Sequence, residues 1–194
     1  MSIKDYNLAA FALNVENFST DLTTIDTAHM FMIFSLVIAL KPYKLLELGV
    51  GKGYATQAML AGIKYNGVGS LTCVDNLADY CNAEPPFYSD LRRQGVKIIA
   101  PVPEMSFVFS CTDKFDFIMS DADHEKSGLW AEMTNALLNP GGIMCFHDIG
   151  DVYPNSKLVL EMVEKHGYSK MLFDANTRPD ERCERGFLVV KKDK

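Results

Sequence analysis

Residues 43–53 have the sequence YKLLELGVGKG, in which a short apolar run is followed by three glycines at alternate positions. The apolar run predicts a buried strand over 43–48, and Pro42 immediately before it marks the end of a preceding helix. Glycine adopts backbone angles that other residues avoid, and it lets the main chain approach a ligand closely. The helix expected over 54–64 would present free N–H groups at its first turn. The segment is therefore typical of a strand–turn–helix unit that contacts a ligand, although a plain tight turn would also use these glycines.

The rest of the chain continues this alternation of short apolar runs and amphipathic segments. Further strands are expected over 69–74, 96–100, 115–120, 143–146, 168–173 and 187–191. Helices are expected over 30–40, 54–64, 125–138 and 156–166, with 79–94 irregular and then helical. The sequence Asn139-Pro140-Gly141-Gly142 predicts a turn between the helix over 125–138 and the next strand. Alternating strands and helices predict a mostly parallel sheet with helices on both faces, whose ligands bind beyond the carboxyl ends of the strands.

Length and composition predict one globular domain. The chain has 194 residues, 48% of them hydrophobic, which suffices for a single substantial core. The formal net charge of −6 and the absence of a long Lys/Arg run argue against nucleic acid and membrane surfaces as partners. The longest apolar run is too short to span a bilayer. Five cysteines without a CxxC pair predict neither a disulfide framework nor a zinc site, so a cytoplasmic location is expected.

Acidic residues flank the predicted ligand-binding turn. Glu47 stands two places before Gly49, and the spacing G-x-G-x-G differs from the G-x-G-x-x-G of dinucleotide-binding proteins. A carboxylate at this position suits a cationic ligand, such as an aminoacyl group, better than a pyrophosphate. Asp75 and Asn76 follow the next strand, where an acid can accept hydrogen bonds from a ligand or simply cap a turn.

A second group of polar residues follows two later strands. Residues 116–124 have the sequence DFIMSDADH, and residues 138–148 begin with LNPGG and end with CFHD. If these strands are neighbours, the carboxylates of Asp121 and Asp148 converge, as suits a hard divalent cation such as Mg²⁺. The alternative is that both acids cap helices or bind water at the rim of the cleft.

These motifs resemble the class I S-adenosylmethionine-dependent methyltransferases. LLELGVGKG is similar to their first motif, and DADH with PGG…HD resembles their small-molecule O-methyltransferase subgroup, methyltransferase family 24. The resemblance extends over 27–191 and is weakest before residue 20 and over 79–94. It implies a Rossmann-like α/β fold, with a seven-stranded, mostly parallel sheet, helices on both faces and an antiparallel last strand. It also implies one methyltransferase domain over 1–194, with an N-terminal helical cap at 1–40 and a Rossmann-like core at 41–194.

The resemblance implies S-adenosylmethionine as cofactor and assigns roles to individual residues. Asp75 matches the acid that hydrogen-bonds the ribose, and Glu104 follows the strand that commonly contacts the adenine. The cofactor-binding residues expected in this way are Glu47, Gly49, Gly51, Gly53, Asp75, Asn76, Glu104 and Asp121.

The same resemblance implies candidates for the metal and for catalysis. Catechol-type relatives hold a metal through three positions that match Asp121, His147 and Asp148. Because the middle position is histidine here, and imidazole suits transition metals, the prediction of Mg²⁺ is weakened. His124 occupies the place of a catalytic lysine, so it is a candidate general base with Asp123 or Asp148 as orienting partner. His147 competes for the same role.

The function expected from the sequence is O-methylation of a small hydroxylated molecule, such as a sugar, a polyketide or a catechol. Three alternatives remain open: a non-catalytic S-adenosylmethionine-binding protein, a nicotinamide-dependent oxidoreductase, and a hydroxylase-like relative. The resemblance also makes a homodimer plausible, and it allows Thr27 or His29 of the N-terminal segment to face the ligand.

Overall fold

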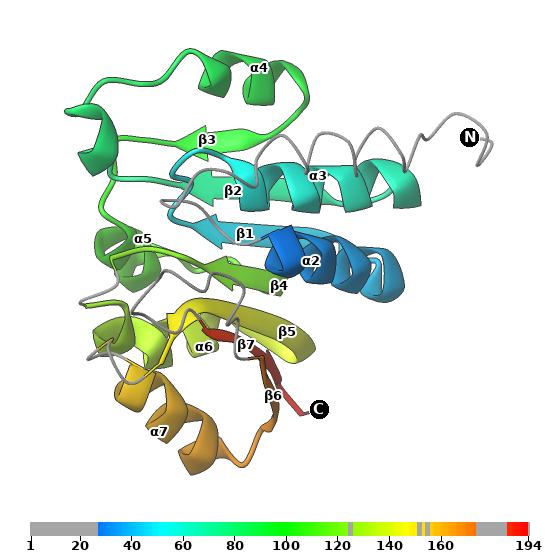
Figure 1. Cartoon of the computed structure of the whole chain (residues 1–194), viewed down its shortest axis with the longest axis vertical. Coiled ribbons are helices and arrows are strands. Elements are labelled where there is room, and N and C mark those ends of the chain that lie inside the picture. The colour runs from blue at the N-terminus through cyan, green and yellow to red at the C-terminus, as the bar shows by residue number, and fades with distance from the viewer. Residues whose placement is uncertain (1–26, 124–125, 151–152, 154–155, 174–185, 194) are drawn as a thin grey trace.

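The computed structural model describes residues 27–123, 126–150, 153, 156–173 and 186–193. A seven-stranded sheet forms its centre, in the order β3-β2-β1-β4-β5-β7-β6 (Figure 1). The strands are β1 (Lys44–Leu48), β2 (Ser70–Val74), β3 (Lys97–Ile99), β4 (Phe115–Ser120), β5 (Leu138–Ile149), β6 (Ser169–Phe173) and β7 (Gly186–Lys191). Strands β1 to β5 pair in parallel, whereas β7 runs antiparallel to both β5 and β6. The predicted mostly parallel sheet with an antiparallel last strand is therefore confirmed.

Helices cover both faces of this sheet, as predicted. They are α2 (Thr27–Leu40), α3 (Tyr54–Asn66), α4 (Phe87–Arg93), α5 (Glu104–Ser110), α6 (Ala131–Leu137) and α7 (Ser156–His166), with short 3₁₀ turns η2 (Ala78–Tyr80) and η3 (Ser127–Trp130). One core packs α2, α3 and α4 against one face, and a second core packs α5, α6 and α7 against the other. Helices α2 and α3 lie side by side in front of the sheet in Figure 1. None of the helices among the described residues has the length and apolarity that crossing a membrane requires.

The predicted N-terminal cap is described only in part. Helix α2 buries a stripe at helical spacing against the core, formed by Met30, Ile33, Phe34 and Val37. This apolar contact makes α2 part of the same folded unit as the Rossmann-like core. The remainder of the cap, residues 1–26, lies outside the described residues, and the division into cap and core stays a prediction.

The sequence Asn139-Pro140-Gly141-Gly142 follows the end of a helix as predicted, since α6 ends at Leu137, but it lies within β5 and does not separate the helix from that strand. The pairing of β4 with β5 shifts its register between Phe115 and Phe117, so a bulge accommodates these residues. The Gly141 N–H donates to the carbonyl of Lys192 at 2.9 Å, and the Lys192 N–H donates to the carbonyl of Gly142 at 3.0 Å. Hydrogen bonds with Lys192 thus hold this turn-like sequence, in which Gly141 has φ +80°, inside the sheet as a bulge. Helix α5 was not predicted either, since its seven residues are too few to show a clear periodicity.

Asp116 joins three segments at the amino-terminal edge of the sheet. Its carboxylate accepts hydrogen bonds from the backbone N–H groups of Tyr43 and Lys44 at 2.9 and 3.0 Å, and from the Asn139 side-chain amide at 2.7 Å. Partial burial opposes ionisation, but these hydrogen bonds outweigh it and lower the pKa of Asp116.

We expect Asp116→Ala to lower the free energy of unfolding by about 2–3 kcal/mol, because the N–H donors lose a charged acceptor. The matched control is Asp113→Ala, which removes an exposed ion pair with Lys44 at 3.3 Å and should cost less than about 0.5 kcal/mol. Urea unfolding of both variants measures the difference. Equal losses would show that Asp116 does not hold the segments together.

Candidate cofactor and active site

The glycine loop lies where the strand order reverses, between β1 and its two neighbours β2 and β4. The Gly49 N–H donates to the Val74 carbonyl at 2.9 Å, and the Asp121 N–H donates to the Leu48 carbonyl at 2.8 Å. Gly49 has φ +84°, and a Cβ placed on it would lie 2.5 Å from the backbone oxygen of Asp121. Only glycine fits this position, and the loop meets the end of β4 without side chains between them. Such a switch point is where open α/β sheets bind ligands.

Asp75 holds the glycine loop from the end of β2. Its Oδ2 accepts hydrogen bonds from the N–H groups of Val50 and Gly51 at 2.8 and 3.2 Å, and its Oδ1 accepts one from Leu77 at 2.6 Å. The side chain is buried. The structure thus gives Asp75 a role that its sequence position did not reveal, namely the ordering of loop amides. Its expected contact with a ribose stays a prediction, and a carboxylate has lone pairs for further donors.

Glu47 is fully buried below the loop. Its Oε2 accepts hydrogen bonds from the Thr56 hydroxyl at 2.6 Å and the Cys73 thiol at 2.9 Å, whereas Oε1 has no hydrogen-bond partner among the described residues. Burial raises the pKa of the Glu47 carboxyl to about 8, although these hydrogen bonds partly oppose the shift. The residue is therefore in the right region for the predicted cofactor contact, but in this structure it faces the core.

Two more predicted cofactor residues meet beside Asp75. The Asn76 side-chain amide lies 3.4 Å from a carboxylate oxygen of Glu104, which begins α5 after β3. Glu104 is buried, and this burial raises the pKa of its carboxyl. Asn76 follows β2 and Glu104 follows the neighbouring strand β3. The sheet therefore brings both residues to the same edge as the glycine loop, as their predicted roles require.

Asp121, His147 and Asp148 form a compact cluster at the ends of β4 and β5, as predicted. The His147 Nδ1 lies 3.1 Å from Asp121 Oδ1 and 3.3 Å from Asp148 Oδ1. One ligand atom from each residue lies within 4.8 Å of the others, so the group has the spacing to hold a metal ion. Burial would lower the pKa of His147, but the charges and hydrogen bonds of the two aspartates outweigh burial and raise it to about 10. Its Nε2 is buried and has no hydrogen-bond partner among the described residues.

Two of the six non-glycine residues with positive φ in the described part of the chain lie in or close to this cluster. Asp148 has φ +54° and Asp123 has φ +21°, both in a region that non-glycine residues seldom adopt. Residues held in such conformations are common at active sites. Asp123, a predicted orienting residue, forms an ion pair with Lys126 at 3.4 Å. His124, the predicted general base, lies outside the described residues.

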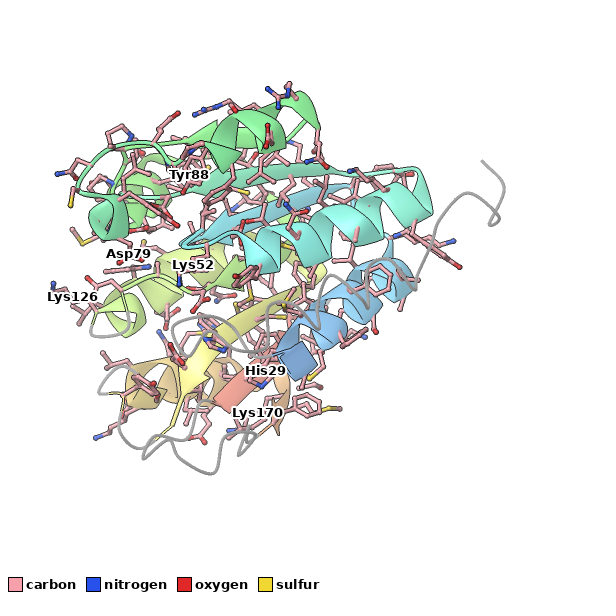
Figure 2. The ribbon with its side chains drawn as sticks, turned by 45° about the horizontal axis from the view of Figure 1, so that its top comes forward. His29, Lys52, Asp79, Tyr88, Lys126 and Lys170 are labelled. Atoms are coloured by element: carbon pink, nitrogen blue, oxygen red, sulfur yellow. The ribbon has the colours of Figure 1, made fainter. Side chains whose placement is uncertain are left out.

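His29 joins the cluster from the beginning of α2, beside β7 (Figure 2). Its buried ring lies edge-on to the His147 ring at a centroid distance of 5.2 Å and stacks on Phe187 at 4.9 Å. The sequence suggested only that His29 or Thr27 could face a ligand, and nothing is described of the Thr27 side chain. The contact with His147 depends on how α2 packs against the sheet, so no local pattern could reveal it.

Comparison with known proteins identifies the family of the chain. A family model described as a methyltransferase domain, family 24, matches residues 46–149, more than half of the chain. No protein with a curated function matches the chain by sequence.

Solved structures with the same fold include three methyltransferases. The O-methyltransferase from Bacillus cereus, bound to S-adenosylhomocysteine, has a TM-score of 0.63 and 15% identity, with 95% of this chain and 90% of that chain covered. The O-methyltransferase TomG from Streptomyces achromogenes, bound to S-adenosylmethionine, has a TM-score of 0.67 and 13% identity, with 96% and 89% covered. The methyltransferase PaMTH1 from Podospora anserina, bound to S-adenosylhomocysteine, has a TM-score of 0.66 and 16% identity, with 98% and 92% covered.

The sheet order and the glycine loop at the switch point define a Rossmann-like class I methyltransferase fold. The chain belongs to the methyltransferase-domain family whose model covers β1 to β5, and the resemblance found in its motifs is confirmed.

Proposed function

We propose that this protein transfers the methyl group of S-adenosylmethionine to a hydroxyl oxygen of a small molecule. The observation that carries the proposal is the junction of the glycine loop with the end of β4, where the Gly49 backbone and Asp121 are in contact. A cofactor bound along the loop would have its reactive end beside the cluster of Asp121, His147 and Asp148. The O-methyltransferases of the same fold, two of them crystallised with this cofactor or its product, support the choice of reaction.

The chemistry requires an acceptor oxygen that loses its proton and is aligned with the sulfonium methyl group. We propose His124 as the general base, because it follows Asp121 by three residues in the DADH motif. His147 suits this role less well, since both aspartates face its Nδ1 and its raised pKa keeps the ring protonated near neutral pH. Its charge and position favour a second function, the fixing of the two carboxylates at the reaction site.

The proposal predicts micromolar binding of S-adenosylmethionine and S-adenosylhomocysteine by calorimetry, with no binding of NADH. With an accepted substrate, His124→Ala should lower kcat by about 100-fold or more and leave the affinity for S-adenosylhomocysteine unchanged, because a base acts only on the acceptor. Lys165→Ala, which removes only an exposed ion pair with Glu132, is the control. A folded protein that binds neither cofactor form would refute the methyltransferase proposal, and an active His124→Ala variant would refute the base assignment alone.

We also propose the cluster of Asp121, His147 and Asp148 as a divalent metal site, on the basis of its ligand spacing. A bound ion would displace the proton that His147 otherwise holds, because only the neutral imidazole is a ligand. The ion would attract an acceptor oxygen and favour its ionised form. The imidazole in the set favours a transition metal over Mg²⁺. Titration should therefore show tighter binding of Mn²⁺ or Zn²⁺ than of Mg²⁺, and His147→Ala should reduce this preference. A protein that binds none of the three ions would leave the cluster as a hydrogen-bonded group that acts without metal.

A further inference from the structure

The segment between β2 and β3 extends over the glycine loop at the carboxyl end of the sheet. Sequence resemblance to the methyltransferases is weakest here, yet the structure gives the segment a specific contact. The Tyr80 hydroxyl donates a hydrogen bond to the Gly51 carbonyl at 2.9 Å, from the end of η2. Asp79, the residue before Tyr80, and Lys52 of the loop are both labelled at this edge in Figure 2. Tyr80 thus links the segment between β2 and β3 to the glycine loop.

Aromatic packing holds Tyr80 in place. Its ring contacts Phe87 edge-to-face at a centroid distance of 6.3 Å, and Phe87 contacts the fully buried Tyr88 in the same way at 5.0 Å. Phe87 also covers Gly53, since a Cβ on that glycine would lie 2.9 Å from the phenyl ring. Edge-to-face aromatic pairs are favourable and directional. The segment therefore contacts the loop at two places, through a hydrogen bond at Gly51 and through the Phe87 ring at Gly53.

Hydrogen bonds fix the peptide groups on both sides of Gly51. Its N–H donates to Asp75 at 3.2 Å, while its carbonyl accepts from Tyr80. A trans peptide is planar, with its carbonyl and its N–H pointing in opposite directions. By fixing the carbonyl of Gly51, Tyr80 therefore also fixes the direction of the Lys52 N–H. Glycine itself would leave this peptide free to rotate, because it has no Cβ to restrict it.

We propose that Tyr80 is a positioning residue that holds the peptide between Gly51 and Lys52 in the orientation needed for cofactor binding. The proposal rests on the proposed function, since it assigns the cofactor to this loop. Tyr80 acts through the backbone of the loop and does not need to touch the cofactor. A loop ordered before binding loses less conformational freedom when the ligand arrives, so removal of the hydroxyl should weaken affinity.

The test is Tyr80→Phe, which keeps the aromatic contact with Phe87 and removes only the hydroxyl. A single hydrogen bond of this kind corresponds to a loss of about 3- to 10-fold in affinity for S-adenosylhomocysteine, measured by calorimetry. The matched control is Tyr168→Phe, because the Tyr168 hydroxyl donates to the Asn135 side chain at 3.2 Å, away from the loop. The control should leave the affinity unchanged and alter thermal stability by a similar amount.

Amide hydrogen exchange of the cofactor-free protein supplies a second readout. The Gly53 N–H donates to the Val50 carbonyl at 2.8 Å within the loop, so its exchange rate reports on loop order. Exchange should be faster in Tyr80→Phe and unchanged in Tyr168→Phe. Equal affinity of Tyr80→Phe and the wild type, or equal affinity losses in both variants, would overturn the proposal. A wild type that binds no S-adenosylhomocysteine would overturn the proposed function and the cofactor role together, even if exchange at Gly53 still depends on Tyr80.

Discussion

Replacing Gly49 by alanine is expected to destabilise the protein by about 3–5 kcal/mol and to weaken S-adenosylhomocysteine binding more than tenfold. The new Cβ would lie 2.5 to 2.8 Å from three backbone atoms of Asp121 and Ala122. Backbone atoms at the end of a central strand cannot move aside as a flexible side chain can, so the glycine loop or the end of β4 must shift. Either shift separates the two elements whose junction forms the proposed site.

The matched control for this prediction is Gly51→Ala. Gly51 also has a positive φ, +49°, but a Cβ there has no heavy atom within 4 Å. Alanine at this position therefore suffers only conformational strain, about 1–2 kcal/mol. Urea unfolding and calorimetry of the two variants separate crowding from strain. If Gly49→Ala were no more harmful than Gly51→Ala, the close contact between the loop and β4 would be of no importance to the site.

The second large effect is expected for Glu47→Gln and concerns the pH dependence of stability. The pKa of Glu47 is about 8 in the folded protein against 4.5 as its ordinary value. Because the pKa is higher in the folded protein, the protonated Glu47 carboxyl stabilises the fold. This contribution is fully present below pH 4.5 and is lost as the pH rises through 8. The cofactor-free wild type should lose about 3–5 kcal/mol over this interval through Glu47. Glutamine does not ionise and should lack this slope, so the variant should be the more stable protein above pH 8.

Thermal or urea unfolding at pH 5 and pH 8.5 measures this difference. Glu84→Gln is the matched control, since Glu84 forms an exposed pair with Arg92 at 2.6 Å and hydrogen bonds to Arg92 lower its pKa. That variant should gain no stability at high pH. Parallel stability curves for wild type and Glu47→Gln would mean that the buried carboxyl is not protonated in the folded protein.

Sequence periodicity predicted most of the fold, because each short apolar run is long enough to form a buried strand. Strand β4 and helix α7 have the predicted bounds, and the other strands apart from β5 differ by one residue at one or both ends. The prediction failed where long-range hydrogen bonds override local preference. The Asn139-Pro140-Gly141-Gly142 sequence stays within β5 as a bulge because its backbone pairs with Lys192, and that contact joins residues far apart in the chain.

The sequence by itself determined the class of protein and the positions from which a site is built. Glycines at alternate positions, an acid after β2 and the DADH and HD motifs lie within short segments, so their spacing is visible without a fold. Only the tertiary structure decided what each side chain contacts. It placed Glu47 in the core, engaged Asp75 with loop amides, brought His29 against His147 and joined Tyr80 to Gly51. These contacts depend on the order of strands and the packing of α2 and η2, because proximity in a folded sheet is set by strand neighbours and not by distance along the chain.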